Sequence, residues 1–157
     1  MAAIPAFYRM FFLYIDPLLC LSGIYVLFFD HATYLDSGVP HGLSKSSIDP
    51  LARYLMNALG SYSLTILGIQ ILLLHRFSEV KIWRVIQFSI LLADLGLLYG
   101  VYATDPLGFW DLGSWTSGDW TNNGILLAVA AIRSLFLLTV RSSGILGAGG
   151  VRAHTSS

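Results

Sequence analysis

The sequence predicts an all-α protein, an integral membrane four-helix bundle, and two observations support this fold class. Hydrophobic residues make up 55% of the 157 residues and charged residues only 11%, whereas soluble domains carry roughly a quarter charged residues. The apolar residues also gather in four segments of about 20 residues, the length that crosses a hydrocarbon core of about 30 Å. A soluble bundle of this composition would have almost no polar face for water.

Short polar stretches separate the four apolar segments. The predicted spans are Met10–Phe29, Leu51–Leu74, Trp83–Tyr102 and Thr121–Val140. The second has a clear start signal, because Asp49 can cap the helix and Pro50 occupies the first turn, where its missing N–H costs nothing. Asp119, Thr121 and Asn122 can cap the fourth in the same way.

The first apolar segment resembles a secretory signal, but Asp16 and Pro17 interrupt it and no convincing cleavage site follows. We therefore expect it to remain as a span. Residues 1–141 then form one four-helix transmembrane domain. Residues 142–157, rich in Gly and Ser, form a flexible C-terminal tail.

Basic residues near the span ends predict the orientation of the bundle. The N-terminus, the turn between the second and third spans and the C-terminal tail share one side. That side holds Arg9, Arg76, Lys81, Arg84, Arg141 and Arg152. The opposite side holds only Lys45 and Arg53. Positive residues collect on the cytoplasmic side, so both termini are expected in the cytoplasm. Cytoplasmic termini fit either the endoplasmic reticulum or the plasma membrane, and we expect the endoplasmic reticulum.

Two longer loops, residues 30–50 and 104–120, lie on the opposite side. The second contains Phe109, Trp110, Trp115 and Trp120. Such aromatic residues prefer the membrane interface, which is the simpler interpretation. The alternative is a lid that places Asp105, Asp111 and Asp119 around an entrance.

Three ionisable residues, Asp16, Asp94 and Arg133, lie inside the predicted spans. Each costs several kcal/mol in a membrane unless it is paired or hydrated, so such residues indicate function. At helical rise they lie roughly 9, 16 and 12 Å from the cytoplasmic ends of their spans and can meet in one layer. They are the candidate catalytic residues.

The charges of this layer leave two interpretations open. In the first, one carboxylate is in excess over the single cation. An unpaired carboxylate favours its neutral form in low dielectric, whereas one held by Arg133 stays ionised. The two residues can then serve as acid and base. Alternatively, Arg133 only neutralises Asp94 and locks two helices together, while Asp16 reaches the cytoplasmic interface.

Polar residues near this layer are candidates for holding an oxygenated ligand. The candidate substrate-binding residues are Asn57, Tyr62, Tyr99 and Trp120. Several other polar side chains in the spans are expected only to hydrogen-bond between helices. Gln70 and Gln87 lie near the cytoplasmic ends and are expected at the interface.

Several other functions are disfavoured by the sequence. His31, His41, His75 and His154 lie at or beyond the span ends, without the spacing of a buried metal site, so neither a metal nor another cofactor is expected. The single cysteine, Cys20, is expected to be a packing residue. A net charge of zero without basic runs argues against nucleic-acid binding.

A set of residues spread over most of the chain resembles the signature of a largely uncharacterised family of small fungal four-span membrane proteins. The set comprises Phe7-Tyr8-Arg9, Phe12, Tyr14, Asp16-Pro17, Tyr34-Leu35, Ala93-Asp94-Leu95-Gly96, Leu98-Tyr99, Trp110-Asp111, Trp120, Asn123-Gly124, Arg133 and Phe136-Leu137-Leu138. Proteins of this kind occur in fungal secondary-metabolite biosynthesis, where they resemble epoxide hydrolases or cyclases. The resemblance implies an enzyme that opens epoxides of oxidised polyketides or terpenoids.

The leading hypothesis is therefore a cofactor-independent, membrane-embedded epoxide hydrolase or cyclase with a lipophilic small-molecule substrate. The acid and base would come from Asp16 and Asp94, with Arg133 between them. The competing hypotheses are a non-catalytic lipid-binding or transport protein and a structural subunit, although the lack of an inverted repeat argues against a secondary transporter. The bilayer is an expected partner in each case, and a homo-oligomer is left open. The catalytic hypothesis requires that the three residues converge.

Overall fold

The structure of the chain is a computed structural model that describes residues 4–38 and 48–140. Within these residues the chain is helical and contains no strand. In chain order the elements are α1 (Ala6–Met10), η1 (Phe11–Ile15), α2 (Asp16–Phe29), α3 (His31–Gly38), α4 (Pro50–Arg76), α5 (Val80–Thr104), α6 (Pro106–Trp110), α7 (Ser117–Asp119), η2 (Trp120–Gly124) and α8 (Ile125–Thr139). The segments η1 and η2 are π-helical and continue the helices on either side of them.

Four continuous helices are long and apolar enough to cross a membrane. They run over Ala6–Phe29, Pro50–Arg76, Val80–Thr104 and Ser117–Thr139. Each contains nearly all of one predicted span, so the prediction of an all-α fold with four such helices is confirmed. The predicted flexible tail, residues 142–157, lies outside the described residues.

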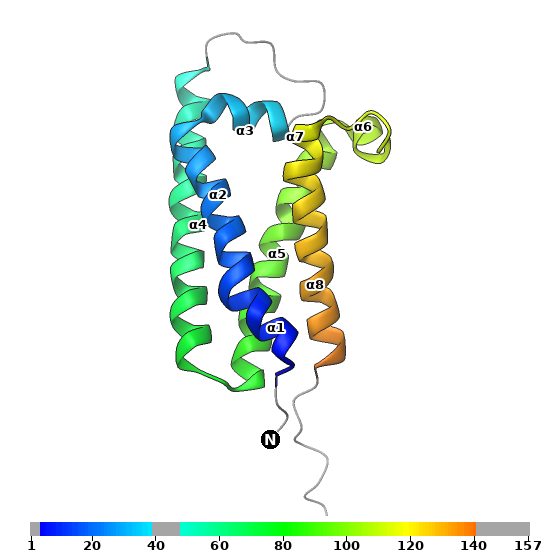
Figure 1. The fold of residues 1–157 in the computed structure, drawn as a ribbon. Coiled ribbons are helices and arrows are strands. Elements are labelled where there is room, and N and C mark those ends of the chain that lie inside the picture. Colours follow the sequence, from blue (N-terminus) through cyan, green and yellow to red (C-terminus); the bar gives the residue numbers. More distant parts are fainter. Residues whose placement is uncertain (1–3, 39–47, 141–157) are drawn as a thin grey trace, which may run out of the picture.

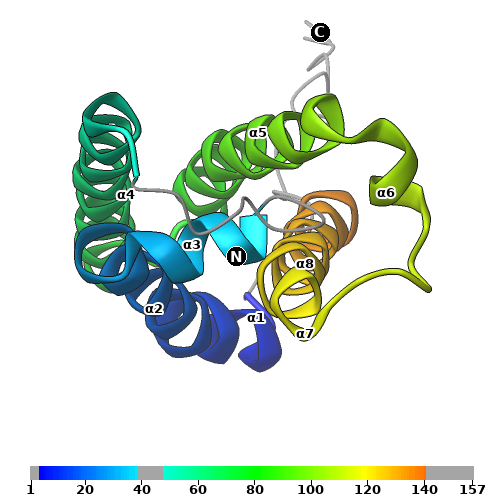
Figure 2. The same ribbon diagram turned by 90° about the horizontal axis from the view of Figure 1, so that it is seen from above.

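The four long helices form two antiparallel pairs (Figures 1 and 2). The first long helix packs along α4, and α5 packs along α8. Helix α3 lies across the end of the bundle opposite the N-terminus and contacts α7 and η2, so it connects one pair to the other (Figure 1). At the other end, the turn between α4 and α5 joins the two pairs.

The best-packed part of the core lies at the end that carries the N-terminus and the α4–α5 turn. Its centre is formed by Phe12, Trp83 and Phe136, which are almost fully buried. The rings of Phe12 and Phe136 meet edge to face with centroids 5.4 Å apart. These contacts join the first long helix, α5 and α8, and aromatic pairs of this geometry add to the stabilisation from burial.

Arg84 fixes the C-terminal end of α8 to α5. Its Nη1 donates to the carbonyl oxygens of Leu137 at 2.5 Å and Val140 at 2.6 Å. These carbonyls end the helix and lack partners within it, so a cation at this position satisfies them and suits the helix dipole. The guanidinium is therefore engaged with the protein itself.

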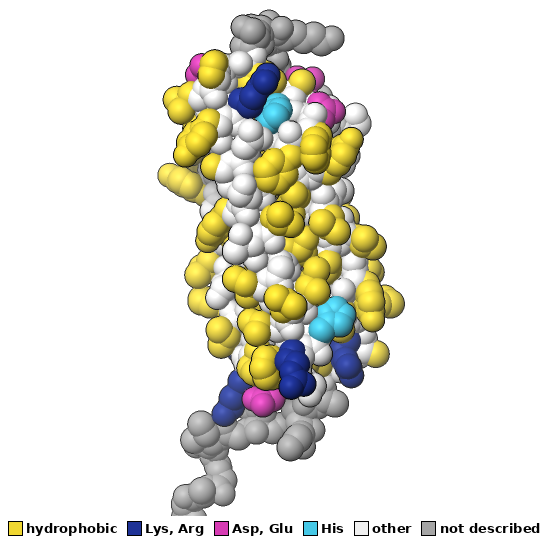
Figure 3. Space-filling model, turned by 90° about the vertical axis from the view of Figure 1, so that its left-hand side faces the viewer, with side chains coloured by type: hydrophobic (Ala, Val, Ile, Leu, Met, Phe, Trp, Pro, Cys, Tyr) yellow, Lys and Arg dark blue, Asp and Glu magenta, His cyan; other side chains and the backbone are white. Residues whose placement is uncertain are grey.

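The outer surface of the bundle carries many large apolar side chains. Leu18, Leu72, Val85 and Leu138 are each more than 60% exposed. Figure 3 shows hydrophobic side chains over the length of one face, with Lys and Arg side chains near its two ends. Such a surface exceeds the apolar patches that soluble proteins expose and suits a hydrocarbon environment.

The loop after α5 folds onto itself and onto the end of the bundle. Phe109 and Trp115 are buried, whereas Trp110 and Trp120 are exposed, so the four aromatic residues do not share one environment. The three loop acids bind nearby groups of the loop. Oδ1 of Asp105 accepts from Gly108 N, Oδ1 of Asp111 from Gly113 N, and Oδ2 of Asp119 from Thr116 N and Oγ1. These acids stabilise turns and short helices, and none of them lines either of the pockets described below.

Candidate functional site

Asp16, Asp94 and Arg133 meet in the interior of the bundle. Arg133 Nη2 donates to both carboxylate oxygens of Asp16 at 2.7 Å, and its Nη1 donates to Oδ2 of Asp94. The exposed fractions are 4% for Asp16, 7% for Asp94 and 3% for Arg133. Asp16 thus belongs to the charged layer, and the alternative in which it reaches the interface is wrong. Helices α2, α5 and α8 each supply one residue.

Two glutamines complete this cluster from α4 and α5. Gln70 Nε2 donates to Asp16 Oδ2 at 2.7 Å and to the carbonyl oxygen of Phe12 at 3.0 Å. Gln87 Oε1 accepts from Arg133 Nε at 3.1 Å. Both glutamines are buried, so the prediction that they lie at the interface is wrong. All four long helices therefore contribute to one hydrogen-bonded cluster, which we call the acid–arginine cluster: Asp16, Gln70, Gln87, Asp94 and Arg133.

The error arose because depth along a helix does not tell which face of the helix looks inward. Gln70 shares a face with Leu67 and Leu74, which lie three residues before and four after it and are buried. Gln87 shares a face with Trp83 and Leu91 in the same way. The helical spacing of these apolar neighbours was the signal that could have placed the glutamines in the interior.

The π segment explains how the first long helix presents its acid and why Gln70 is needed. Asp16 N donates to the carbonyl oxygen of Phe11, five residues back, and so passes over the carbonyl of Phe12. The next residue, Pro17, has no N–H and cannot supply the missing bond. The carbonyl of Phe12 is left without a backbone donor, and Gln70 takes its place. The Asp-Pro pair and Gln70 thus form one local structure.

Gln87 leaves a buried donor without a partner beside the charges. Arg133 only donates hydrogen bonds, so Gln87 must turn its oxygen toward Arg133 Nε, and its amide nitrogen faces the other way. Gln87 Nε2 has no hydrogen-bond partner among the described residues. Buried polar groups are nearly always satisfied, so this N–H marks a position for an oxygen atom of water or of a ligand.

The four predicted substrate-binding residues lie away from the acid–arginine cluster. Asn57 Oδ1 is 3.0 Å from His31 Nε2, at the end of the bundle near α3. Tyr62 and Tyr99 are 64% and 68% exposed and lie on the outer surface. Trp120 is also exposed and packs edge to face against Trp115. A contact of these residues with a substrate stays a prediction.

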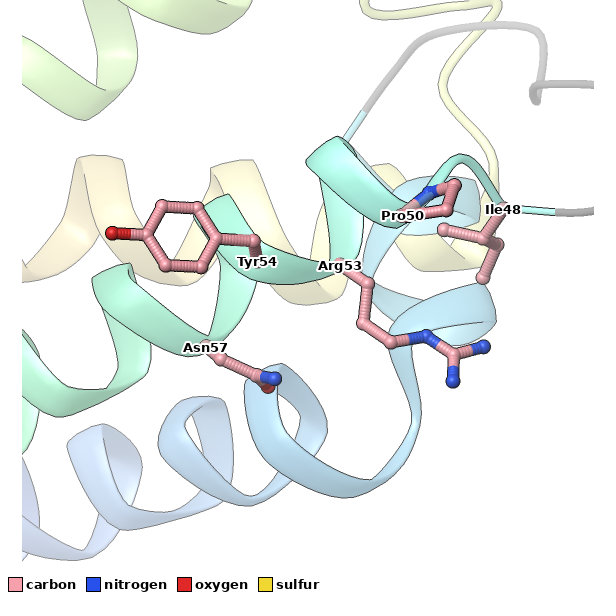
Figure 4. Close-up of a pocket in the computed structure, with 5 residues that line it drawn as sticks. All are labelled: Ile48, Pro50, Arg53, Tyr54 and Asn57. Carbon is pink, nitrogen blue, oxygen red and sulfur yellow. The ribbon is translucent and has the colours of Figure 1, made fainter.

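Two hollows lie toward the α3 end of the bundle. The larger, about 470 Å³, is an open hollow at the start of α4 lined by Ile48, Pro50, Arg53, Tyr54 and Asn57. Figure 4 shows that Tyr54 points away from Arg53 and Ile48, so these side chains do not converge on one point. The smaller, about 240 Å³, lies among α3, α5 and the η2–α8 helix.

The smaller hollow lies on the same side of the bundle as two members of the acid–arginine cluster. Its wall includes Leu97, which is three residues from Asp94, and Leu126, which is seven residues from Arg133. These spacings correspond to one and two helical turns, so the residues share a face of α5 and a face of α8 with the two charges.

Metal and thiol chemistry have little basis in the described part of the chain. No group of three or more His, Cys, Asp or Glu side chains there is arranged to hold a metal ion. Cys20 is half-buried on α2, one turn from Asp16. The expectation that no cofactor is needed stays a prediction.

Comparison with known proteins identifies a family but no characterised relative. Neither a curated protein nor a solved structure matches the chain. One family model, described as a domain of unknown function (DUF7704), matches residues 1–143. This match covers all four long helices and the whole acid–arginine cluster. The chain therefore belongs to the DUF7704 family.

Proposed function

We propose that this protein is a membrane-embedded epoxide hydrolase or cyclase that opens the epoxide of a lipophilic polyketide or terpenoid in fungal secondary-metabolite biosynthesis. The observation that supports the proposal is the pairing of two buried carboxylates with one guanidinium, supplied by Asp16, Asp94 and Arg133 from three helices. Epoxide opening needs an acid for the oxirane oxygen and a base for the nucleophile, and a carboxylic acid beside a carboxylate supplies both.

The cluster holds its proton on Asp94. Two ionised carboxylates and one guanidinium would leave one buried negative charge, and a single proton removes it. Asp16 receives hydrogen bonds on both oxygens from Arg133 and a further one from Gln70, so it is the acid with more donors. Asp94 is bonded to Arg133 through Oδ2 alone and is the most exposed of the three. Its Oδ1 is the proton donor.

The reaction then follows from these two states. Asp94 donates its proton to the oxirane oxygen as the C–O bond breaks. The oxygen of water, or of a hydroxyl group within the substrate, attacks the carbon and loses its proton to the Asp16 carboxylate. Water gives a diol and an internal hydroxyl gives a cyclic ether. The proton returns from Asp16 to Asp94 through solvent, and the cycle is closed.

Arg133, Gln87 and Gln70 are positioning residues in this scheme. Arg133 holds both carboxylates against one planar group, which limits their separation to the span of a guanidinium. Gln87 fixes Arg133 through Nε and offers its unpartnered Nε2 to the attacking water. Gln70 prevents Asp16 from turning away. Rigid placement of this kind supplies a large part of catalysis.

The proposed setting is the endoplasmic reticulum membrane, with both termini in the cytoplasm. Arg9, Arg76 and Lys81 are exposed at the end of the bundle that would face the cytoplasm. The acid–arginine cluster lies within helices that would cross the hydrocarbon, which favours a substrate that dissolves in the membrane. This supports a lipophilic substrate.

A non-catalytic role of the cluster is the second candidate, and one observation favours it. Every nitrogen of the Arg133 guanidinium donates to a partner, and each residue of the cluster is at least nine-tenths buried. In this second role the cluster fixes four helices in register and has no catalytic function, as would suit a lipid-binding, transport or structural protein. The two roles predict different results for substitutions that keep the fold.

The proposed function is tested by incubating membranes that contain the protein with decene oxide and with an epoxide of farnesol. A mass gain of one water indicates hydrolysis, and an isomer of unchanged mass indicates cyclisation. We expect Asp94→Asn to lower the rate roughly 100-fold or more, because general acid catalysis typically contributes 10²–10⁴-fold. Asp111→Asn, which changes an exposed loop carboxylate, is the matched control. Equal rates in the two variants would contradict the proposal.

A further inference from the structure

The smaller hollow combines an apolar wall with a polar rim. Leu35, Leu97, Val101 and Leu126 form much of the wall. Tyr34, Thr104 and Asn122 lie at the end toward α3 and α7. Burial raises the pKa of Tyr34 above its ordinary value. The hollow therefore suits a mainly apolar molecule that can form hydrogen bonds at one end.

Two glycines create the space. Gly96 and Gly100 lie one turn apart on α5, and a Cβ atom added to either would meet nothing within 4 Å. Glycine destabilises a helix interior relative to alanine, so these positions have no packing reason to lack a side chain. The absence of side chains opens the wall of the hollow along one full turn of α5.

The same spacing of glycines can also pair transmembrane helices, but the surroundings favour a ligand. In such pairs the glycine face packs against the backbone of a second helix. Here α3 and the η2–α8 helix of the same chain already line the hollow on its other sides. A small molecule fits this space better than a helix of a second copy.

Two wall residues of the hollow lie close, along their helices, to members of the acid–arginine cluster. Leu97 lies about 4.5 Å of helical rise from Asp94, and Leu126 lies about 10.5 Å from Arg133 on the antiparallel neighbour. The hollow has a volume of about 240 Å³. The end of the hollow at Gly96 and Leu97 is the end from which a bound molecule would extend toward Asp94.

We propose that the hollow between α3, α5 and the η2–α8 helix binds the apolar body of a lipophilic oxygenated molecule and directs one end of it toward Asp94. The direction of the ligand rests on the proposed function, whereas the binding itself does not. The side chains of Leu35, Leu97, Val101 and Leu126 contact the apolar body. At the other end, the side-chain amide of the rim residue Asn122 holds a hydroxyl or carbonyl group.

The test measures binding separately from turnover. The full-length protein in lipid nanodiscs is labelled with a decanol that carries a photoreactive diazirine in mid-chain, with and without excess decene oxide. Labelled positions are mapped by mass spectrometry. Gly100→Leu fills the hollow, and Gly100→Ala adds one methyl group into open space and guards against loss of the fold. Gly23→Leu is the matched control, because Gly23 is exposed on α2 and a Cβ there also meets nothing within 4 Å.

We expect labelling within residues 96–101 and 122–126 that decene oxide suppresses. Gly100→Leu should reduce this labelling roughly tenfold, which corresponds to about 1.4 kcal/mol of binding free energy. Gly100→Ala should reduce it less, and Gly23→Leu should leave it unchanged. If labelling persists while epoxides are not opened, the proposed function fails and the binding site stands.

Two results would overturn the inference. One is labelling spread over the outer surface of the bundle to the same extent in all four proteins. The other is a dimer of the wild-type chain that Gly100→Leu dissociates, with no labelling of the hollow, which would assign the glycine face to a second copy.

Discussion

Replacing Arg133 by methionine removes the one cation that holds the two buried acids. The substitution abolishes the bonds from Nε to Gln87, from Nη1 to Asp94 and from Nη2 to Asp16, and leaves the two buried acids without a cation between them. Removing one partner of a buried ion pair costs about 3–5 kcal/mol. For a chain of this size that corresponds to a fall of about 6–20 °C in the midpoint of thermal unfolding.

The triple variant Asp16→Leu, Asp94→Leu, Arg133→Met isolates the cause of this loss. It replaces the whole set of charges by apolar side chains of similar size, which is often neutral or stabilising. We expect its unfolding midpoint to lie well above that of Arg133→Met, because the hydrogen bonds of Gln70 to Asp16 and of Gln87 to Arg133 are lost but no buried charge remains. Cys20 is the sole cysteine and is half-buried, so a thiol-reactive fluorophore reports unfolding without further engineering.

Two outcomes would refute this reasoning. If Arg133→Met unfolds at the wild-type temperature, the guanidinium does not hold the helices together. If the triple variant is as unstable as Arg133→Met, the loss comes from packing and not from uncompensated charge. Leu135→Met, at an exposed position on the same helix, is the control for the substitution itself.

Three further predictions concern the surroundings of the cluster. Gln70→Leu should destabilise the protein by about 1–3 kcal/mol for each of its two acceptors. Gln87→Met should destabilise it less, because that substitution also removes a donor without a partner among the described residues. Thermal unfolding of both variants in detergent shows which is the less stable. Pro17→Ala restores a backbone N–H beside the π segment, so a double-mutant cycle should show the cost of Gln70→Leu reduced by roughly 1 kcal/mol, and full additivity would disprove the link. Hydrogen bonds from Thr33 lower the pKa of Asp30, so the stability of the α3 start is complete above the ordinary carboxyl pKa and is lost as the pH falls through the lowered value. The protection of α3 amides, corrected for the intrinsic pH dependence of exchange, should therefore fall in acid, whereas Asp30→Asn should show no such fall.

Much of the fold was predictable because a membrane constrains the length and composition of its helices. An apolar segment of the right length has few alternatives to a spanning helix, so the four long helices were placed to within a few residues. The cost of a charge in hydrocarbon made Asp16, Asp94 and Arg133 conspicuous for the same reason. Their depths allowed them to meet in one layer, but depth did not exclude the alternative in which Asp16 reaches the interface.

The remaining parts of the site depend on facts that composition does not carry. Gln70 and Gln87 are common interfacial residues, and only their helical faces place them inside. The π segment arises from an interplay of Pro17 with its neighbours that no propensity scale encodes. The smaller hollow exists because α3 folds back over the bundle, which a sequence of eight residues with mixed polarity does not predict.

The triple variant also gives the most direct test of the central claim that the acid–arginine cluster catalyses epoxide opening. Nanodiscs that contain either the wild type or the triple variant are incubated with the same epoxides, and product is measured after thermal unfolding has shown that both proteins are folded. The account predicts turnover by the wild type and none above the protein-free background by the triple variant. Equal turnover by a folded triple variant would contradict it, because the reaction would then proceed without Asp16, Asp94 and Arg133.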